Sequence, residues 1–165
     1  MNNMGELGKI ISPSRAERKI RAIVERLKNG GYATGQFFSI GAIENRLLND
    51  AKTRDIEVAK GHLYIDDKQV QHALRDAHIR DGVDVPIDDF VTFPDRLSIM
   101  ELWYDTRKNN YVYLDRQNKC KYIVDTNRKI RINRRITKHA VVITAQRLHS
   151  VKLFGTDSTY EKING

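Results

Sequence analysis

The sequence is poor in the residues that crosslink a protein or anchor it in a membrane. It contains one cysteine, Cys120, in 165 residues, so neither an internal disulfide nor a cysteine cluster can form. No uninterrupted apolar run is long enough to cross a bilayer, and the opening residues MNNMGELGKIIS lack the basic and then apolar layout of a signal peptide. We therefore expect a protein of the reducing cytoplasm that makes no contact with a membrane.

The common motifs of metal and nucleotide chemistry are also missing. The chain has no HExxH, no cysteine pair and no DxDxDG loop, and His72 and His78 are spaced so that they do not converge on one side of a helix. P-loop, GxGxxG and GxSxG patterns are absent too, and Cys120 lies in an expected strand without a base beside it. These absences exclude ATP-driven and covalent-hydrolase chemistry, and we expect neither a metal nor another cofactor.

The charge is concentrated in one part of the chain. Composition is 40% hydrophobic and 30% charged, typical of a soluble globular protein, and the length fits a single domain over residues 1–165. The net charge is +8, yet residues 1–115 contain 17 Lys and Arg against 18 Asp and Glu, whereas residues 116–152 contain 11 against one, Asp125. A run of charge is often only a solvated face. A basic excess of this size on strand-like sequence favours a phosphate-binding surface.

Helical spacing dominates the first half of the chain. Residues 14–28, SRAERKIRAIVERLK, predict an amphipathic helix, with Ser14 and Glu17 spaced as a capping box and Gly30-Gly31 closing it. A second helix is predicted over about residues 39–49. A third helix begins after Asp66, its expected N-cap.

From Leu97 onward, apolar residues alternate with polar ones, which predicts strands. Polar breaks separate five segments: SIMELWYDT, YVYLD, CKYIVD, KIRINRRI and AVVITAQRL. We therefore expect an α+β fold in which N-terminal helices pack on one face of a C-terminal antiparallel sheet of four to five strands. Residues 1–36 would form an N-terminal helical extension and residues 37–154 the core. Tyr111 and Tyr113 are expected in that core, with base stacking as the alternative.

The segment VQHALRDAHIRDG, residues 70–82, concentrates histidine, arginine and aspartate on the third expected helix. His72 falls outside the apolar stripe of this helix and is free to face solvent or a cleft. Cleavage of RNA by its own 2′-hydroxyl needs a base, an acid and fixed cations beside the phosphate. Histidine suits the proton steps and arginine suits the phosphate. His72, Arg75 and His78 are therefore candidates for this chemistry.

The late strands supply further candidates. Alternation in KIRINRRI places Arg131 and Arg135 on one face, and with Thr144 of the next strand they are expected to line one open surface. Plainer explanations exist for each residue. A helix histidine such as His72, beside Asp76, often makes only a surface hydrogen bond, and Thr144 is ordinary strand-forming sequence. Composition and spacing alone support a basic α+β domain that binds nucleic acid.

The stretch HLYIDDKQVQHALRDAHIRDGVDVPIDDFVTFPDRLSI resembles the phage-encoded branch of the barnase, EndoU, colicin and RelE-like (BECR) ribonuclease superfamily. The resemblance rests on a hydrophobic-x-His-Ala-Leu signature at residues 70–74, on His78 and the later Gly82, on the Pro-Ile-x-x-Asp and Pro-Asp-like elements that begin at Pro86 and Pro94, and on VVITA at residues 141–145. It covers about residues 37–147. Members of this branch occur as domains of phage head-associated and polyvalent proteins.

This resemblance implies His72 as the leading catalytic residue and Thr144 as a group that positions the phosphate or the 2′-hydroxyl. We expect a metal-independent endoribonuclease, toxin-like and of phage or mobile-element origin, that cuts RNA through a 2′,3′-cyclic phosphate. Arg75 and Arg131 would neutralise the phosphate charge. RNA and an acidic immunity or inhibitor protein are the expected partners.

Further RNA-binding candidates are basic side chains of the third helix and the late strands. They are His78, Lys119, Lys121, Arg128, Arg134, Arg135, Lys138 and Arg147. Two alternatives stay open. One is a non-catalytic nucleic-acid-binding phage protein on the same fold. The other is a structural or host-interaction protein whose basic sheet binds an acidic protein.

Overall fold

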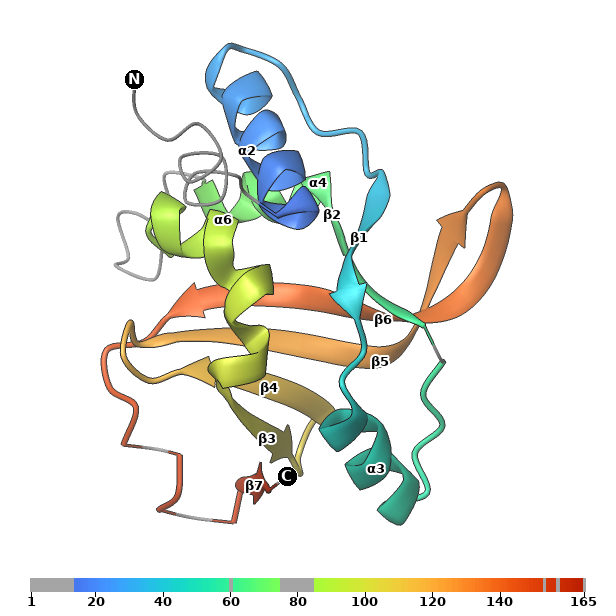
Figure 1. Ribbon diagram of the computed structural model, residues 1–165, viewed down its shortest axis with the longest axis vertical. Coiled ribbons are helices and arrows are strands. Elements are labelled where there is room, and N and C mark those ends of the chain that lie inside the picture. The colour runs from blue at the N-terminus through green and yellow to red at the C-terminus, as the bar shows by residue number, and fades with distance from the viewer. Residues whose placement is uncertain (1–13, 60, 75–84, 153, 157, 165) are drawn as a thin grey trace, which may run out of the picture.

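The computed structural model describes residues 14–59, 61–74, 85–152, 154–156 and 158–164. The fold is α+β, as predicted (Figure 1). Its elements, in chain order, are α2 (Arg15–Lys28), β1 (Phe37–Ala42), α3 (Asn45–Thr53), β2 (His62–Asp66), α4 (Asp67–Leu74), α6 (Ile87–Arg96), the 3-10 helix η1 (Leu97–Ile99), β3 (Glu101–Asp105), β4 (Asn110–Asp115), β5 (Cys120–Ile132), β6 (Arg135–Arg147) and β7 (Tyr160–Ile163).

The strands form one mixed sheet of seven strands, in the order β1-β2-β6-β5-β4-β3-β7. β2 and β6 are parallel, and every other pair of neighbours is antiparallel. The predicted sheet of four to five antiparallel strands is therefore wrong in strand number and in the β2–β6 pairing. The predicted sheet covered β3 to β6 but left out β1, the short β7 and β2, although the segment HLYI of β2 was expected to be extended.

Residues 39–49, predicted as one helix, divide between β1 and α3. Gly41 has φ 143, a conformation that a helix cannot contain and that glycine adopts at little cost. It follows a break in the β1–β2 register, and the Ile43 amide then donates to the Gly61 carbonyl at 2.9 Å. The apolar residues that suggested helical spacing, Ile40, Ile43 and Leu47, are all buried, but they reach the core from a strand, a turn and a helix.

The segment KIRINRRI, predicted as one strand, contains a hairpin turn. Asn133 and Arg134 have φ 50 and 67, the positive values that a two-residue hairpin turn requires. On its N-terminal side, β5 runs without interruption through the polar residues 126–128, because a bulge between Asp125 and Arg128 absorbs the change in register. The expected break was therefore placed too early.

The helix α2 begins as predicted. Ser14 is its N-cap, and its hydroxyl accepts a hydrogen bond from the Glu17 amide at 3.0 Å, which satisfies one of the free amides of the first turn. The stripe of Ala16, Ile20, Ile23 and Val24 is buried. Through this stripe α2 packs beside α4 and α6.

Two tyrosines of β4 connect the sheet to α3 through hydrogen bonds. Tyr111 and Tyr113 are buried in the core, as predicted. The Tyr111 hydroxyl donates to the Asp50 carboxylate and the Tyr113 hydroxyl donates to the Glu44 carboxylate, each at 2.6 Å. Burial and these acceptors raise the pKa of both phenols. The two side chains are therefore structural and are closed to base stacking.

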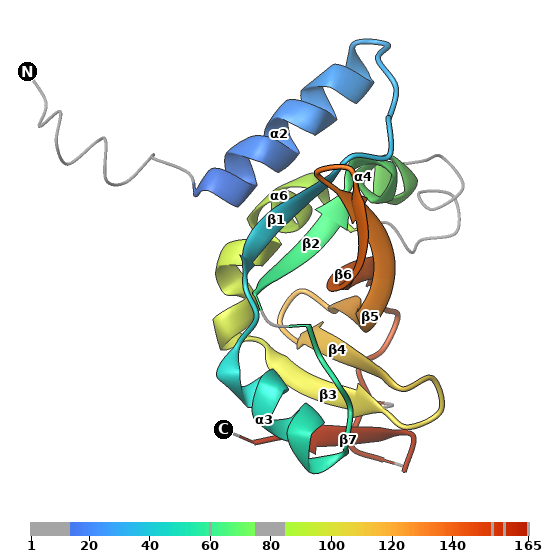
Figure 2. The same ribbon diagram turned by 90° about the vertical axis from the view of Figure 1, so that its right-hand side faces the viewer.

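The two faces of the sheet differ. The helices share one buried cluster with the residues of one face, and α2, α3 and α6 lie on the same side of the sheet in Figure 2. On the other face, Trp103, Val112 and Leu114 form a smaller cluster with Phe154 of the C-terminal segment. That segment covers the β3–β4 part of this face and reaches β5, because Ile123 packs against the same cluster.

Candidate nucleic-acid interface

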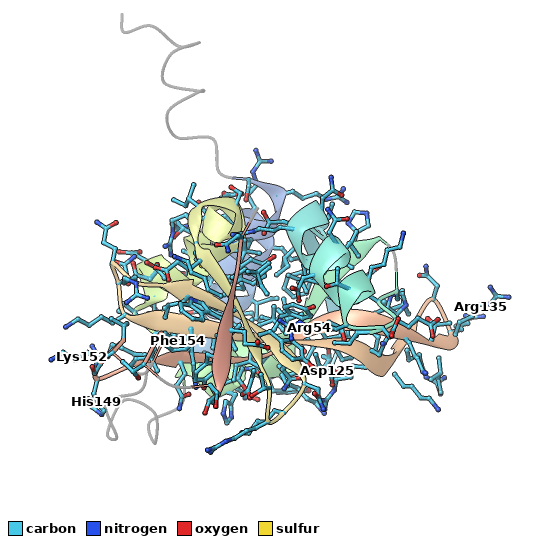
Figure 3. The ribbon with its side chains drawn as sticks, turned by 90° about the horizontal axis from the view of Figure 1, so that it is seen from below. Arg54, Asp125, Arg135, His149, Lys152 and Phe154 are labelled. Atoms are coloured by element: carbon cyan, nitrogen blue, oxygen red, sulfur yellow. The ribbon has the colours of Figure 1, made fainter. Side chains whose placement is uncertain are left out.

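The hairpin formed by residues 128–139 extends beyond the rest of the sheet. The pairing of β5 with β4 ends at Val124, and β6 pairs with β2 only at Ala140 and Val141. From Arg128 to the turn and back to His139, the two strands therefore pair with each other alone. We call these residues the β5–β6 arm. It stands out from the sheet in Figure 1, and Figure 3 shows Arg135 at its outer end.

The arm is strongly cationic and exposed. It contains six Lys and Arg and no Asp or Glu, and all six side chains are exposed: Arg128, Lys129, Arg131, Arg134, Arg135 and Lys138. Arg128 lies 3.9 Å from the Asp125 carboxylate. Within the described residues, the other five have no carboxylate at ion-pair distance. Like charges so close together repel one another, so a polyanion would bind here with a gain in free energy.

Both faces of the arm carry positive charge. Arg131 pairs with Ile136 and Ile132 pairs with Arg135, and paired residues of an antiparallel ribbon share a face. Arg131 therefore lies on the face of Lys129 and Lys138, and Arg135 lies on the opposite face. The prediction that Arg131 and Arg135 line one surface is wrong, because the turn at Asn133 and Arg134 reverses the chain between them.

The face of the sheet opposite the helices carries polar side chains on β5 and β6. Tyr122 and Ala145 point into the helix-covered core, so their neighbours on the strands point to the opposite face. These neighbours include Lys121, paired with Gln146, and Thr144, paired with Ile123. Lys121 and Thr144 are half-buried. Burial, followed by the charge of Lys108, lowers the pKa of Lys121, so its ammonium group gives up a proton more readily than an exposed lysine.

The helix α4 places His72 beside the strand that carries Thr144. It continues directly from β2, which is parallel to β6, and it packs against β6. Its predicted N-cap is confirmed, because the Gln69 amide donates to the Asp66 carboxylate at 2.8 Å. His72 is half-buried on this helix. Arg75 and His78 lie outside the described residues.

A buried carboxylate fixes the start of α4. Asp67 is 2% exposed and accepts hydrogen bonds from the Thr34 amide and hydroxyl, from the Gly35 amide and from the Arg26 guanidinium, at 2.7 to 3.0 Å. Burial alone would raise the pKa of Asp67, but these donors hold it below its ordinary value. They tie α4 to α2 and to the preceding loop, which fixes the position of the backbone that carries His72.

Among the residues that the structure describes, the predicted site residues do not gather in one groove. Ile136, the partner of Arg131, lies eight residues before Thr144 on β6, which corresponds to about 26 Å along the strand. The expectation that Arg131 and Thr144 line one surface is therefore wrong. The interpretation of the late strands overlooked the hairpin arm as a separate unit.

The other predicted basic residues are dispersed. Arg147 pairs with Cys120 and so lies on the helix-covered face, and Lys119 lies in the β4–β5 turn with φ 56. His149 and Lys152, which were not among the predicted residues, lie at the end of the molecule opposite Arg135 (Figure 3). Among the predicted RNA-binding residues, the arm brings together Arg128, Arg134, Arg135 and Lys138. It adds Lys129 and His139, which the prediction left out although both belong to the same alternating sequence.

Other chemistry finds little support in the described parts of the chain. Burial raises the pKa of the Cys120 thiol to about 12, so this side chain is a thiol at neutral pH and a poor nucleophile. In the described segments, no group of three or more His, Cys, Asp or Glu side chains could hold a metal ion. Nor does any helix found there have the length and apolar character needed to span a membrane.

Comparison of the chain with known protein families, with curated protein sequences and with solved structures gave no match.

Proposed function

We propose that this protein binds RNA and that the β5–β6 arm holds the phosphate backbone. The observation that carries the proposal is the set of five exposed cations on the arm without a carboxylate partner in the described residues. Several arginines elsewhere pair with carboxylates, as Arg54 with Asp50 at 2.7 Å and Arg116 with Glu101 at 2.6 Å. A merely solvated face would be expected to carry acidic residues between the basic ones, as α2 does with Glu17 and Glu25.

Binding of this kind depends strongly on salt. If the arm neutralises about five phosphates of a single strand, the affinity falls about a hundredfold between 50 and 200 mM salt. Fluorescence anisotropy with a labelled single-stranded RNA tests this. Strong salt dependence that disappears when the arm cations are replaced supports the proposal, and RNA binding that is unchanged by those replacements contradicts it.

A second proposed function is metal-independent endoribonuclease activity on the face of the sheet opposite the helices. It is favoured by the packing of α4, which carries His72, against β6, which carries Thr144, with Lys121 on the neighbouring strand. In this proposal His72 takes or gives a proton, Thr144 positions the ribose or phosphate, and Lys121 balances the charge on the phosphate, a role that Arg131 is too distant to fill. The 2′-oxygen attacks phosphorus, the 5′-oxygen leaves with a proton, and a 2′,3′-cyclic phosphate remains.

The two proposals are separable by experiment. The purified protein is incubated with total RNA in EDTA beside His72→Ala, and the products are examined for 2′,3′-cyclic phosphate ends. Cleavage by the parent protein and its loss in His72→Ala support the nuclease. Intact RNA with the parent protein leaves a non-catalytic RNA-binding protein. If the parent protein cleaves RNA and His72→Ala does not, we further propose a toxin-like role in the cytoplasm with an acidic inhibitor as partner.

A further inference from the structure

A groove separate from the arm runs between α2 and β1. It encloses a cavity of about 740 Å³, within the size range of ligand sites. Its wall on the sheet side consists of four consecutive residues of β1, 38–41, and its wall on the helix side comes from the first half of α2. We call it the α2–β1 groove.

The groove follows the free edge of the sheet. β1 is the outermost strand and pairs only with β2. Phe38 and Ser39 precede the register shift and point to opposite faces, and both line the cavity, so the cavity reaches around the edge of β1. Backbone amides and carbonyls of β1 that do not pair with β2 lie on this free edge, and the Gly41 amide donates to the Ser39 hydroxyl at 3.3 Å.

The rim of the groove is basic. Arg15, Arg18 and Lys19 of α2 line it, and Asp95 is the acidic residue among its lining side chains. The ammonium group of Lys19 lies 5.8 Å from the centre of the Phe38 ring. The groove thus combines an apolar floor, a row of cations and a strand edge.

His62 and Ser39 add a polar pair to the wall. Their side chains lie 2.6 Å apart, from Ser39 Oγ to His62 Nδ1, and both residues are exposed. The bulge between Ser39 and Gly41 interrupts the regular edge, so the groove suits a short extended segment better than a long strand.

We propose that the α2–β1 groove binds a short, extended, acidic segment of a partner protein, which adds to β1 as an antiparallel or parallel strand. A peptide backbone matches the spacing of amides and carbonyls along a strand edge, and a sugar-phosphate backbone does not. The basic rim selects acidic side chains, and the floor near Phe38 and Ile40 accepts the apolar ones. The inference is independent of RNA binding by the arm.

The test uses a fluorescein-labelled peptide of alternating glutamate and valine, with binding measured by anisotropy on the full chain. The double variant Arg15→Glu/Lys19→Glu is expected to bind about tenfold more weakly, because it reverses two charges on the rim. Lys28→Glu, at the other end of the same helix, is the matched control and is expected to bind like the parent. Ala22→Trp fills the groove without a change in charge and is expected to abolish binding. Circular dichroism confirms that each variant is folded.

A second arm of the test examines the strand edge itself. The same peptide with alternate amides N-methylated cannot donate to β1, and its binding is expected to be lost. Equal binding of the methylated peptide overturns the proposal. The proposal is also overturned if an RNA oligonucleotide displaces the peptide and binds more weakly to Arg15→Glu/Lys19→Glu, because the groove would then be a nucleic-acid site. Variants of the β5–β6 arm are expected to leave peptide binding unchanged, which keeps this proposal distinct from the proposed RNA binding.

Discussion

Asp67, the first residue of α4, accepts a hydrogen bond from the guanidinium of Arg26 in α2 at 2.9 Å. The same carboxylate accepts three more hydrogen bonds from Thr34 and Gly35. The side chain of Asp67 is 3% exposed and that of Arg26 is 47% exposed. The carboxylate is therefore the buried centre of this contact, and Arg26 is a peripheral partner.

Replacement of Asp67 should be far more costly than replacement of Arg26. Asp67→Ala leaves three donors of the loop unpaired, and we expect the free energy of unfolding to fall by about 3 kcal/mol. Arg26→Ala removes only a half-exposed ion pair and should cost less than about 1 kcal/mol. Urea denaturation measures both. Equal losses would show that the ion pair, and not the loop hydrogen bonds, holds α4.

The stability of the protein should fall in acid through Asp67 and Asp115. Burial alone would raise the pKa of both carboxylates, but hydrogen bonds and the charges of Arg26 and Arg96 hold them below the ordinary value of 3.8. A carboxylate with a depressed folded-state pKa stabilises the protein above its unfolded-state value, and this contribution is lost as the pH falls from about 3.8 through the folded-state value. Asp67→Asn should flatten the loss of stability below pH 4 in denaturation curves. If Asp67→Asn loses stability with falling pH as steeply as the parent protein, other groups cause the acid sensitivity.

The arm should make most of the salt-dependent contacts with RNA. Arg131→Ala/Lys138→Ala removes two cations from one face of the arm, and we expect the slope of log affinity against log salt to decrease by about 1.4 for single-stranded RNA. The measurement is anisotropy over a salt series. Lys52→Ala/Lys28→Ala removes the same charge from exposed sites on α3 and α2 and should leave the slope unchanged. A similar decrease in both pairs would indicate that net charge alone attracts RNA.

The turn of the arm contains a conformational cost that glycine would relieve. Arg134 has φ 67, a left-handed conformation that costs a residue with a side chain about 1 kcal/mol or more. Arg134→Gly should slow hydrogen exchange of the arm amides about fivefold, because the turn then suits an Asn-Gly hairpin. Arg134→Ala loses the same charge and keeps the cost, so it should not slow exchange. Equal exchange in the two variants would mean that the turn is not under strain.

Patterns that repeat along a single element were predictable from the sequence. The stripe of α2 repeats over several turns, and Asp66 carries the local signal of a cap, so both predictions are confirmed. The failures are of another kind. Ile40 and Ile43 have helical spacing by coincidence, because a strand followed by a turn buries both side chains equally well. The hairpin turn at Asn133-Arg134 was not predicted because it lacks the glycine that usually marks a two-residue hairpin turn. The parallel pairing of β2 with β6 joins segments far apart in sequence, and no local pattern specifies it.

The same limit applies to the candidate site. Alternation in KIRINRRI assigned the faces correctly up to the turn at Asn133 and Arg134, and beyond it Arg135 and Ile136 lie on the faces opposite to those predicted. The place of Lys129 and His139 in the arm could not be predicted for a related reason. It depends on the register between two strands and not on the neighbouring residues in the sequence.

Lys121 should set the alkaline limit of RNA cleavage if the face of the sheet opposite the helices is the catalytic surface. Burial and then Lys108 lower its pKa from the ordinary value of 10.5, so its positive charge is lost at a lower pH than that of an exposed lysine. Arginine stays protonated throughout this range. We therefore expect Lys121→Arg to shift the alkaline limb of the cleavage rate to higher pH, measured in EDTA with total RNA.

Lys119→Arg is the matched control for this shift. It is the same lysine-to-arginine replacement two residues away, at an exposed position in the β4–β5 turn. It should leave the pH profile where it is. A shift in both variants would mean that any added guanidinium strengthens RNA binding at high pH. If neither variant shifts the pH profile, Lys121 takes no part in the reaction. His72 would then need another cation beside the phosphate. Arg131 cannot provide it, because the register of β5 and β6 places it too far along the arm.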